Sequence, residues 1–285
     1  MAKEKIILAI VAGVLSMTLG VGGMLMFITA QSTTATSSLA FGTIQARLQH
    51  KDGTVPGNGY SWVLPNQILM EGLQVARIEN EKNISAYIAV FAELKLDGQS
   101  VTDDKIKKLI TSGVTEEAML GMLQSILAQG LSKDAEPEDV RLTADEWLFI
   151  PIGDDTFDIN PPDLKRASGT SGLFFYIDKT DPTFDPTQYP AHLGDIKRLP
   201  KLKVFEKSED KTELIFDSIR VPVLSGKEAE AFALIRNHKI NVELTAYLVQ
   251  SEYNQYYLGN DITFTDYIGA FTAAQNFKIN VSTAP

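Results

Sequence analysis

The clearest pattern along the chain is a period of two in hydrophobicity. Between residues 84 and 96, and again between 240 and 248, apolar residues alternate with mainly polar ones. This alternation is typical of a β-strand with one face in a core and the other toward solvent. A third segment covers 215–223, where Pro222 indicates a sheet edge or a bulge. Further expected strands cover 67–78, 172–177 and a segment that starts at Phe41.

The period changes between residues 102 and 130. Thr102 precedes an acidic first turn and a helical stripe of apolar residues, and Thr115 precedes a second such stripe. Threonine is a good N-cap, and glycine commonly ends a helix. The spacing therefore predicts two helices that end at Gly113 and Gly130. We interpret them as a small helical insertion packed against a β-sandwich.

A short third helix is expected near residues 227–236, with Ser225 and Glu228 as a capping box. Residues 153–200 are rich in Pro, Asp and Gly and are expected to form long loops. The predicted fold class is mainly β, a jelly-roll-like β-sandwich with a small helical insertion. The residues expected in its core are Ile88, Val90, Leu94, Ile219, Val242 and Leu244.

The first thirty residues indicate an export signal. Lys3 and Lys5 precede an uncharged apolar run that reaches residue 19, and Ala30 offers a small residue before a cut. The prediction is a signal peptide over 1–30 and one domain over 31–285, secreted to the extracellular space or cell surface. The alternative is a retained membrane-spanning helix, because residues 6–30 carry no charge.

Composition narrows the function classes. The formal net charge is −10, which argues against nucleic acid or an anionic membrane as a partner. A membrane contact is expected only in transit, through the signal segment. The chain has no cysteine, so an exported form depends on core packing and backbone pairing. No phosphate-binding glycine loop, zinc-binding helix motif or nucleophile elbow occurs, and neither an enzyme activity nor a cofactor is expected.

Two acidic clusters are weak calcium candidates. The first comprises Asp154, Asp155, Asp158 and Asp163, and the second comprises Asp178, Asp181 and Asp185. Calcium prefers such hard oxygen ligands, but aspartate beside proline and glycine is also ordinary turn chemistry. Asn83 and Asn280 begin Asn-x-Ser sequences, which accept glycans only in a glycosylating host.

The aromatic Phe27 follows a glycine-containing signal, and the segment 39–46 is similar to a Phe-x-x-Gly-Thr-Leu-x-Leu motif, with Ile44 in the leucine position. In these features the N-terminal hundred residues resemble the TasA/camelysin family of secreted fibre proteins. Residues 240–250 are similar to the closing strand of the family. The resemblance implies a jelly-roll sandwich that polymerises by donor-strand complementation, as in bacterial matrix fibres and archaeal bundling pili.

A donor strand also fits the arrangement of the N-terminus. Residues 31–41 would form a strand-competent arm that fills a neighbour's open sheet edge and gives a head-to-tail homopolymer. Residues 27–41 are expected to be disordered in the monomer and ordered in the polymer. The candidate donor-strand residues are Phe27, Ile28, Leu39, Phe41 and Ile44.

Three alternatives stay open. Leu39 and Phe41 could instead belong to the subunit's own first strand, with Ile44 behind them. A type IV pilin-like subunit would keep residues 6–30 as a packing helix. A surface metallopeptidase is the third, because the camelysin branch carries that label, although His50, His192 and His238 lie far apart in the sequence.

Overall fold

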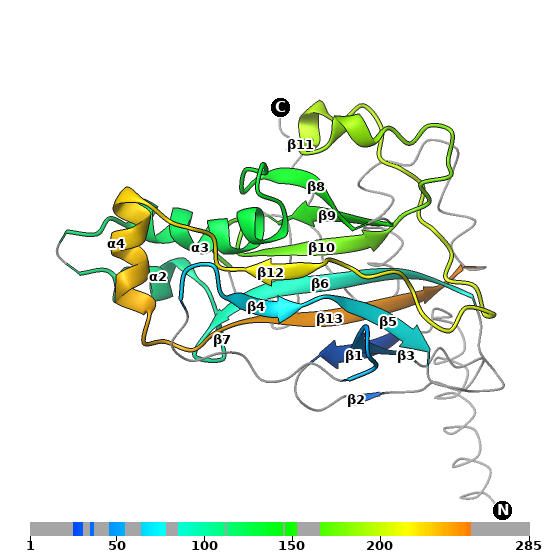
Figure 1. Cartoon of the computed structure of the whole chain (residues 1–285), viewed down its shortest axis with the longest axis horizontal. Helices are drawn as coiled ribbons and strands as arrows, with labels where there is room; N and C mark the ends of the chain where they lie inside the picture. The colour runs from blue at the N-terminus through cyan, green and yellow to red at the C-terminus, as the bar shows by residue number, and fades with distance from the viewer. Residues whose placement is uncertain are drawn as a thin grey trace, which may run out of the picture.

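The computed structural model describes residues 25–30, 35–36, 46–54, 64–77, 85–111, 113–144, 146–152 and 166–251. This part of the chain is mainly β, with its strands in antiparallel sheets and three α-helices (Figure 1). The expectation of a mainly β fold with few helices is therefore confirmed. Within these residues, no helix is both long and apolar enough to cross a membrane.

A large sheet dominates the described part of the chain, with nine strands that are all antiparallel to their neighbours. Its main path has the order β11-β8-β9-β10-β6-β13-β1-β2, and β7 pairs with one end of β6. The strands are β1 (Leu25–Ala30), β2 (Ala35–Thr36), β6 (Ala86–Leu96), β7 (Gln99–Ser100), β8 (Asp139–Ala144), β9 (Trp147–Pro151), β10 (Ser171–Tyr176), β11 (Ala191–His192) and β13 (Ile240–Gln250).

Two small sheets and the helices pack over one face of this sheet (Figure 1). One small sheet pairs β3 with β5, and the other pairs β4 with β12. The elements are β3 (Ala46–His50), β4 (Ile68–Glu71), β5 (Leu73–Arg77), β12 (Ser218–Arg220), α2 (Asp103–Leu109), α3 (Glu116–Leu131) and α4 (Gly226–Ile235). We call the buried cluster between these layers the first core; it includes Leu48, Leu69, Val75, Leu123, Phe174, Ile219 and Leu244.

The opposite face of the sheet is buried as well. A second core gathers Ala89, Phe91, Leu148, Ile150, Leu173, Phe175 and Tyr247 on this face. It is covered by side chains of the irregular segment that follows β10, among them Phe184, Tyr189, Leu199 and Leu202. That segment also contains two short 3₁₀ helices, η1 (Pro186–Gln188) and η2 (Leu193–Asp195).

Strand β6 shows the consequence of this second layer. Its residues Ile88, Val90 and Leu94 lie in the first core, whereas Tyr87 and Phe91 lie in the second. The prediction of a strand with only one face in a core is therefore wrong for β6, because nearly every residue of it is buried.

The six expected core residues are all buried, so that prediction is confirmed. Two expected strands are shorter than predicted. The segment 67–78 divides into β4 and β5 at Gly72, where an added Cβ would lie 2.6 Å from the carbonyl oxygen of Phe216. The segment 215–223 keeps only the three residues of β12, whose pairing with β4 shifts register between Ile219 and Arg220.

Both helices of the predicted insertion are confirmed, with their caps. The hydroxyl of Thr102 accepts a hydrogen bond from the backbone N–H of Lys105 at 3.2 Å, and the hydroxyl of Thr115 accepts one from Ala118 at 3.2 Å. These bonds satisfy backbone donors that have no partner within the helix.

The predicted helix ends were less accurate. Helix α2 ends at Leu109, before Gly113, and α3 continues through Gly130. Gly130 permits close packing rather than termination, because a Cβ there would lie 2.6 Å from the carbonyl oxygen of Arg220. Helix α4 begins after Ser225, but the side chain of Ser225 makes no capping hydrogen bond, so the capping-box prediction is wrong.

Candidate assembly edge beside strand β13

Strand β13 has two edges that are completed by very different parts of the chain. One edge pairs with β6 along all eleven residues, from Ile240 opposite Leu96 to Gln250 opposite Ala86. The other edge pairs with β1 over six residues in unbroken antiparallel register. In Figure 1, β1 (dark blue) lies beside the orange β13, so a segment near the N-terminus completes a strand near residue 250.

The structure places two of the five candidate donor-strand residues on this edge. Phe27 is the register partner of Tyr247, and Ile28 is the register partner of Ala246. Leu39, Phe41 and Ile44 lie outside the described residues, and their roles stay predictions.

The prediction that residues 27–41 are disordered in the monomer is wrong for two of its segments. Residues 27–30 belong to β1, and residues 35–36 form β2, which pairs with β1. The physical reason is the edge itself, because the backbone N–H and C=O groups along an unpaired strand need hydrogen-bond partners. Strand β1 also lies within the segment 1–30 that was expected to be a signal peptide.

The side chains of β13 fix this edge firmly in the body of the protein. Leu244, Ala246 and Leu248 are fully buried in the first core, and Tyr247 is buried in the second. Burial raises the pKa of the Tyr247 hydroxyl because the ionised phenolate would lose its hydration. A strand anchored on both faces in this way presents a rigid edge on which another strand can pair.

A cluster of charged side chains lies near the start of β13, where it pairs with the end of β6. The Nζ atom of Lys95 lies 2.6 Å from Glu243 Oε2 and 3.7 Å from Glu93 Oε2. The Nε atom of Arg166 lies 2.5 Å from Glu93 Oε1. Glu93 and Glu243 are register partners, so the two cations offset a repulsion between carboxylates that face each other across the strands.

Strand β8, near the far end of the sheet, has a different kind of edge. Strand β11 pairs only with Asp139 and Val140 of β8. The pairing of β8 with β9 shifts register between Leu142 and Ala144, and the hydroxyl of the intervening Thr143 donates a 2.6 Å hydrogen bond to the carbonyl oxygen of Ile215. Such irregularity protects an edge from pairing with another strand.

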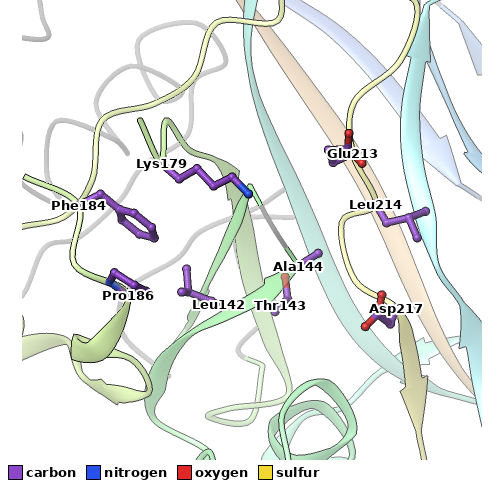
Figure 2. A pocket seen from close by; sticks show the side chains of 9 residues that line it. All are labelled: Leu142, Thr143, Ala144, Lys179, Phe184, Pro186, Glu213, Leu214 and Asp217. Atoms are coloured by element: carbon purple, nitrogen blue, oxygen red, sulfur yellow. The ribbon is translucent and has the colours of Figure 1, made fainter. Parts of the chain in front are cut away.

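An open cleft of about 660 Å³ lies beside this part of β8 (Figure 2). Figure 2 shows Lys179, Phe184 and Pro186 on one side of the cleft and Glu213, Leu214 and Asp217 on the other, with residues of β8 between them. The lining mixes apolar surface with charges of both signs.

The acidic residues of the second predicted cluster form separate turns. The carboxylates of Asp178, Asp181 and Asp185 each accept hydrogen bonds from the backbone N–H and the hydroxyl of the threonine two residues later. These bonds lower the pKa of Asp181 and Asp185 because they stabilise the ionised carboxylate. In the described part of the chain, no three His, Cys, Asp or Glu side chains gather in a way that could hold a metal ion.

The remaining candidates are scattered or not described. His50 lies 3.3 Å from the Gly72 carbonyl oxygen, and His192 and His238 contact Asp139 and Asp97 at 3.5 and 2.7 Å. The three histidines therefore belong to three separate contacts. The residues outside the described ranges are Asn83, Asp154, Asp155, Asp158, Asp163 and Asn280.

Comparisons with protein-family models, with curated proteins and with solved structures found no match to this chain.

Proposed function

We propose that this chain is a secreted structural subunit that polymerises head to tail into extracellular filaments by donor-strand complementation. The observation that carries the proposal is the pairing of β1 with β13, because the strand that completes this edge comes from near the N-terminus. We further propose that the sheets form a jelly-roll-like sandwich, as the resemblance to the TasA/camelysin family implies.

The physical argument starts from the hydrogen bonds of β1. These bonds join backbone groups, so β1 of a second copy can make the same bonds with β13 that β1 of the same chain makes. An exchange of this kind gives a head-to-tail contact between different surfaces of two copies. Repeating such a contact without closing a ring produces a filament.

The position of the signal cleavage decides which segment is the donor. A mature chain that starts at or before Leu25 keeps β1, and β1 is then the donor strand itself. A cut after Ala30 removes β1 and leaves the outer edge of β13 without that partner. In that case the arm of residues 31–41 from a neighbouring subunit fills the edge, with Leu39 and Phe41 as its bulky apolar residues.

The energetics favour exchange over a free arm. Ordering the backbone costs about 1–2 kcal/mol per residue, and a buried large apolar side chain returns about 1.5–3 kcal/mol. The segment 25–30 contains Leu25, Met26, Phe27 and Ile28, whereas 31–38 contains only Ala35 as an apolar residue. By sequence, the segment 25–30 therefore offers far more apolar surface to a sheet edge than 31–38 does.

A pair of introduced cysteines tests the proposal directly. Thr29 and Thr245 are register partners, and Thr29→Cys with Thr245→Cys can form a disulfide only where β1 pairs with β13. The natural chain has no cysteine, so no other thiol competes. We expect oxidised filaments to give a ladder of covalent multimers on non-reducing gels, because the strand comes from a neighbour.

The matched control places cysteines at Glu71 and Ser218, register partners of β4 and β12 in the body of one subunit. This pair should give only monomer under the same conditions. A monomeric disulfide in the Thr29/Thr245 variant within assembled filaments would overturn donor-strand exchange through β1 and leave β1 as part of its own subunit.

N-terminal sequencing of the secreted protein separates the proposal from the pilin-like alternative. A first residue at Phe27, Gln31 or close to them supports donor-strand assembly through the edge of β13. A first residue near Lys5 means that the apolar run is retained, and it contradicts the proposed mechanism.

A further inference from the structure

The end of β6 and the start of β13 bring a lysine and an asparagine directly opposite each other. Lys95 and Asn241 are register partners in the antiparallel pair. Lys95 is held by Glu243 and lies near Glu93. The Oδ1 atom of Asn241 is buried and has no hydrogen-bond partner among the described residues. We propose that Lys95 and Asn241 are joined by an intramolecular isopeptide bond, with Glu243 and Glu93 as the groups that move the protons.

The geometry allows the two side chains to meet. Directly opposite residues of an antiparallel pair have Cβ atoms about 4.5–5.5 Å apart and share a face of the sheet. The four-carbon stem of Lys95 can therefore carry its Nζ atom to the Asn241 side-chain carbonyl. Glu243 is two residues from Asn241 and Glu93 is two residues from Lys95, so both carboxylates lie on this same face.

The surroundings favour the reaction over a simple ion pair. The side chains of Lys95, Glu93 and Glu243 are only 16%, 7% and 15% exposed. The Nζ atom of Lys95 lies 2.6 Å from Glu243 Oε2, so a carboxylate that can accept the ammonium proton is already in contact with it. Arg166 holds the other oxygen of Glu93, and this contact fixes the carboxylate in place.

The proposed step balances without an oxidant or a cofactor. Glu243 accepts a proton from the Lys95 ammonium, and the neutral Nζ attacks the Asn241 side-chain carbonyl carbon. The resulting tetrahedral centre collapses as a glutamic acid gives a proton to the amide nitrogen and the bond from that nitrogen to carbon breaks, and the freed carboxylate takes up the extra proton that remains on Nζ. The products are a secondary amide between the two side chains and one molecule of ammonia.

An exit for the ammonia is present beside the lysine. Lys95 lines an open cleft of about 570 Å³ that also touches the β7 hairpin and α2. The bond would join two central strands of the sheet covalently at one end. The chain has no cysteine, so no disulfide can supply such a link.

Mass spectrometry of the purified protein tests the proposal. The intact mass should fall below the mass of the determined sequence by one ammonia molecule. Proteolysis should release one branched peptide that contains both Lys95 and Asn241, and trypsin should fail to cut after Lys95. Recovery of the two unmodified linear peptides as the main products from the wild-type protein would overturn the proposal without any variant.

Variants identify the reacting groups. Lys95→Arg should have the full mass calculated from its sequence. Loss of ammonia from an asparagine alone, or from an N-terminal glutamine, does not need Lys95 and would persist in this variant. Asn241→Asp should lose water instead and reach the same final mass as the wild type. Glu243→Gln should slow bond formation by about 10²-fold or more, the usual effect of removing a proton-transfer group.

The matched control is Lys203→Arg. Lys203 makes a comparable ion pair with Glu146, at 2.7 Å, in another part of the structure. This variant should keep both the missing ammonia and the branched peptide. A wild-type mass deficit that persists in Lys95→Arg would contradict the assignment and place the modification elsewhere.

Discussion

The outer edges of β13 and β8 both carry backbone N–H and C=O groups that could pair with another strand, but they differ in how these groups are covered. The edge of β13 is filled by β1 over six residues in continuous register. The edge of β8 has only the two residues of β11 as a partner, followed by a register shift and a side-chain hydrogen bond from Thr143. The comparison shows that a regular edge can accept a strand from elsewhere, whereas an irregular edge is closed to strand pairing.

Removal of β1 should have the largest effect on this comparison. A chain expressed from Gln31 lacks residues 25–30 and loses every β1 partner of β13. If β1 is the donor, we expect filament formation to be abolished and the protein to aggregate more readily, since an open regular edge promotes unspecific pairing. Electron microscopy and size-exclusion chromatography measure both effects, with a chain expressed from Met24 as the control. Normal filaments from the shorter chain would show that β1 is not the donor.

Truncation of a side chain beneath each edge should have the next largest effect. Leu244 is fully buried beneath the β1 edge, and Leu142 is partly buried at the β8 edge. We expect Leu244→Ala to lower the free energy of unfolding by about 2–5 kcal/mol, because it leaves a cavity in the first core. Leu142→Ala should cost clearly less. Urea unfolding measures both; equal losses would mean that the two edges are anchored equally well.

A substitution beside the start of β13 should change the free energy of unfolding by a smaller amount, and this change should depend on pH. The Asp97 carboxylate accepts hydrogen bonds from His238 Nδ1 at 2.7 Å and from the backbone N–H of Lys239 at 2.9 Å. The His238 contact is the main cause that lowers the pKa of Asp97. Because the pKa of Asp97 is lower in the folded protein than the value of 3.8 in the unfolded chain, ionised Asp97 stabilises the fold at pH values above 3.8. This stabilisation is lost as the pH falls through the pKa of Asp97 in the folded protein.

We therefore expect Asp97→Asn to cost about 1 kcal/mol at neutral pH, the usual net value of a lost hydrogen bond. The variant should also show a weaker loss of stability in acid than the wild type. Urea unfolding measures this difference when it is repeated from neutral pH down to pH values below the pKa of a free aspartate carboxyl group. Parallel acid curves for the two proteins would contradict the assigned role of Asp97.

The corresponding histidine at the other edge should have the smallest effect. His192 lies 3.5 Å from Asp139, and its side chain is 57% exposed. Exposed ion pairs contribute little, so His192→Ala should change the free energy of unfolding by less than about 0.5 kcal/mol. A cost comparable to that of Asp97→Asn would show that β11 seals the β8 edge more strongly than its two-residue pairing indicates.

The sequence predicted the strands with clear alternation and missed those without it. Strands β6 and β13 were found because apolar residues recur at every second position. Strands β8 and β9 were missed. Arg141 is fully buried on β8, where its guanidinium donates to the carbonyl oxygens of Asp139, Glu136 and Pro137, and a buried arginine gives no apolar signal. Residues 147–150 form an apolar run without a period.

The second buried face of β6 could not be predicted from local pattern. Tyr87 and Glu93 stand at positions that a period of two assigns to solvent. Tyr87 packs in a cluster with Leu199 and Leu202, which lie about a hundred residues later in the chain, and Glu93 contacts Arg166. Contacts between segments so far apart leave no trace in the hydrophobic period of either one.

The candidate site was predicted in part. The sequence identified Phe27 and Ile28 as strand-forming residues of the N-terminal segment, but it did not identify β13 as their partner. Register between distant strands depends on the whole fold, because a shift of one residue would move every side chain to the opposite face. The pairing of Lys95 with Asn241 was not foreseen for the same reason.

The separation of β1 and β13 along the chain also sets an order in time. Residues 25–30 leave the ribosome early, whereas residues 244–249 emerge more than two hundred positions later. Pairings between such distant segments form slowly, since a long loop must close first. During synthesis, each β1 therefore exists before its own β13 is present. In the proposed filament, the edge that a chain completes last would thus be the one at which an older subunit and a newer one compete for the same strand.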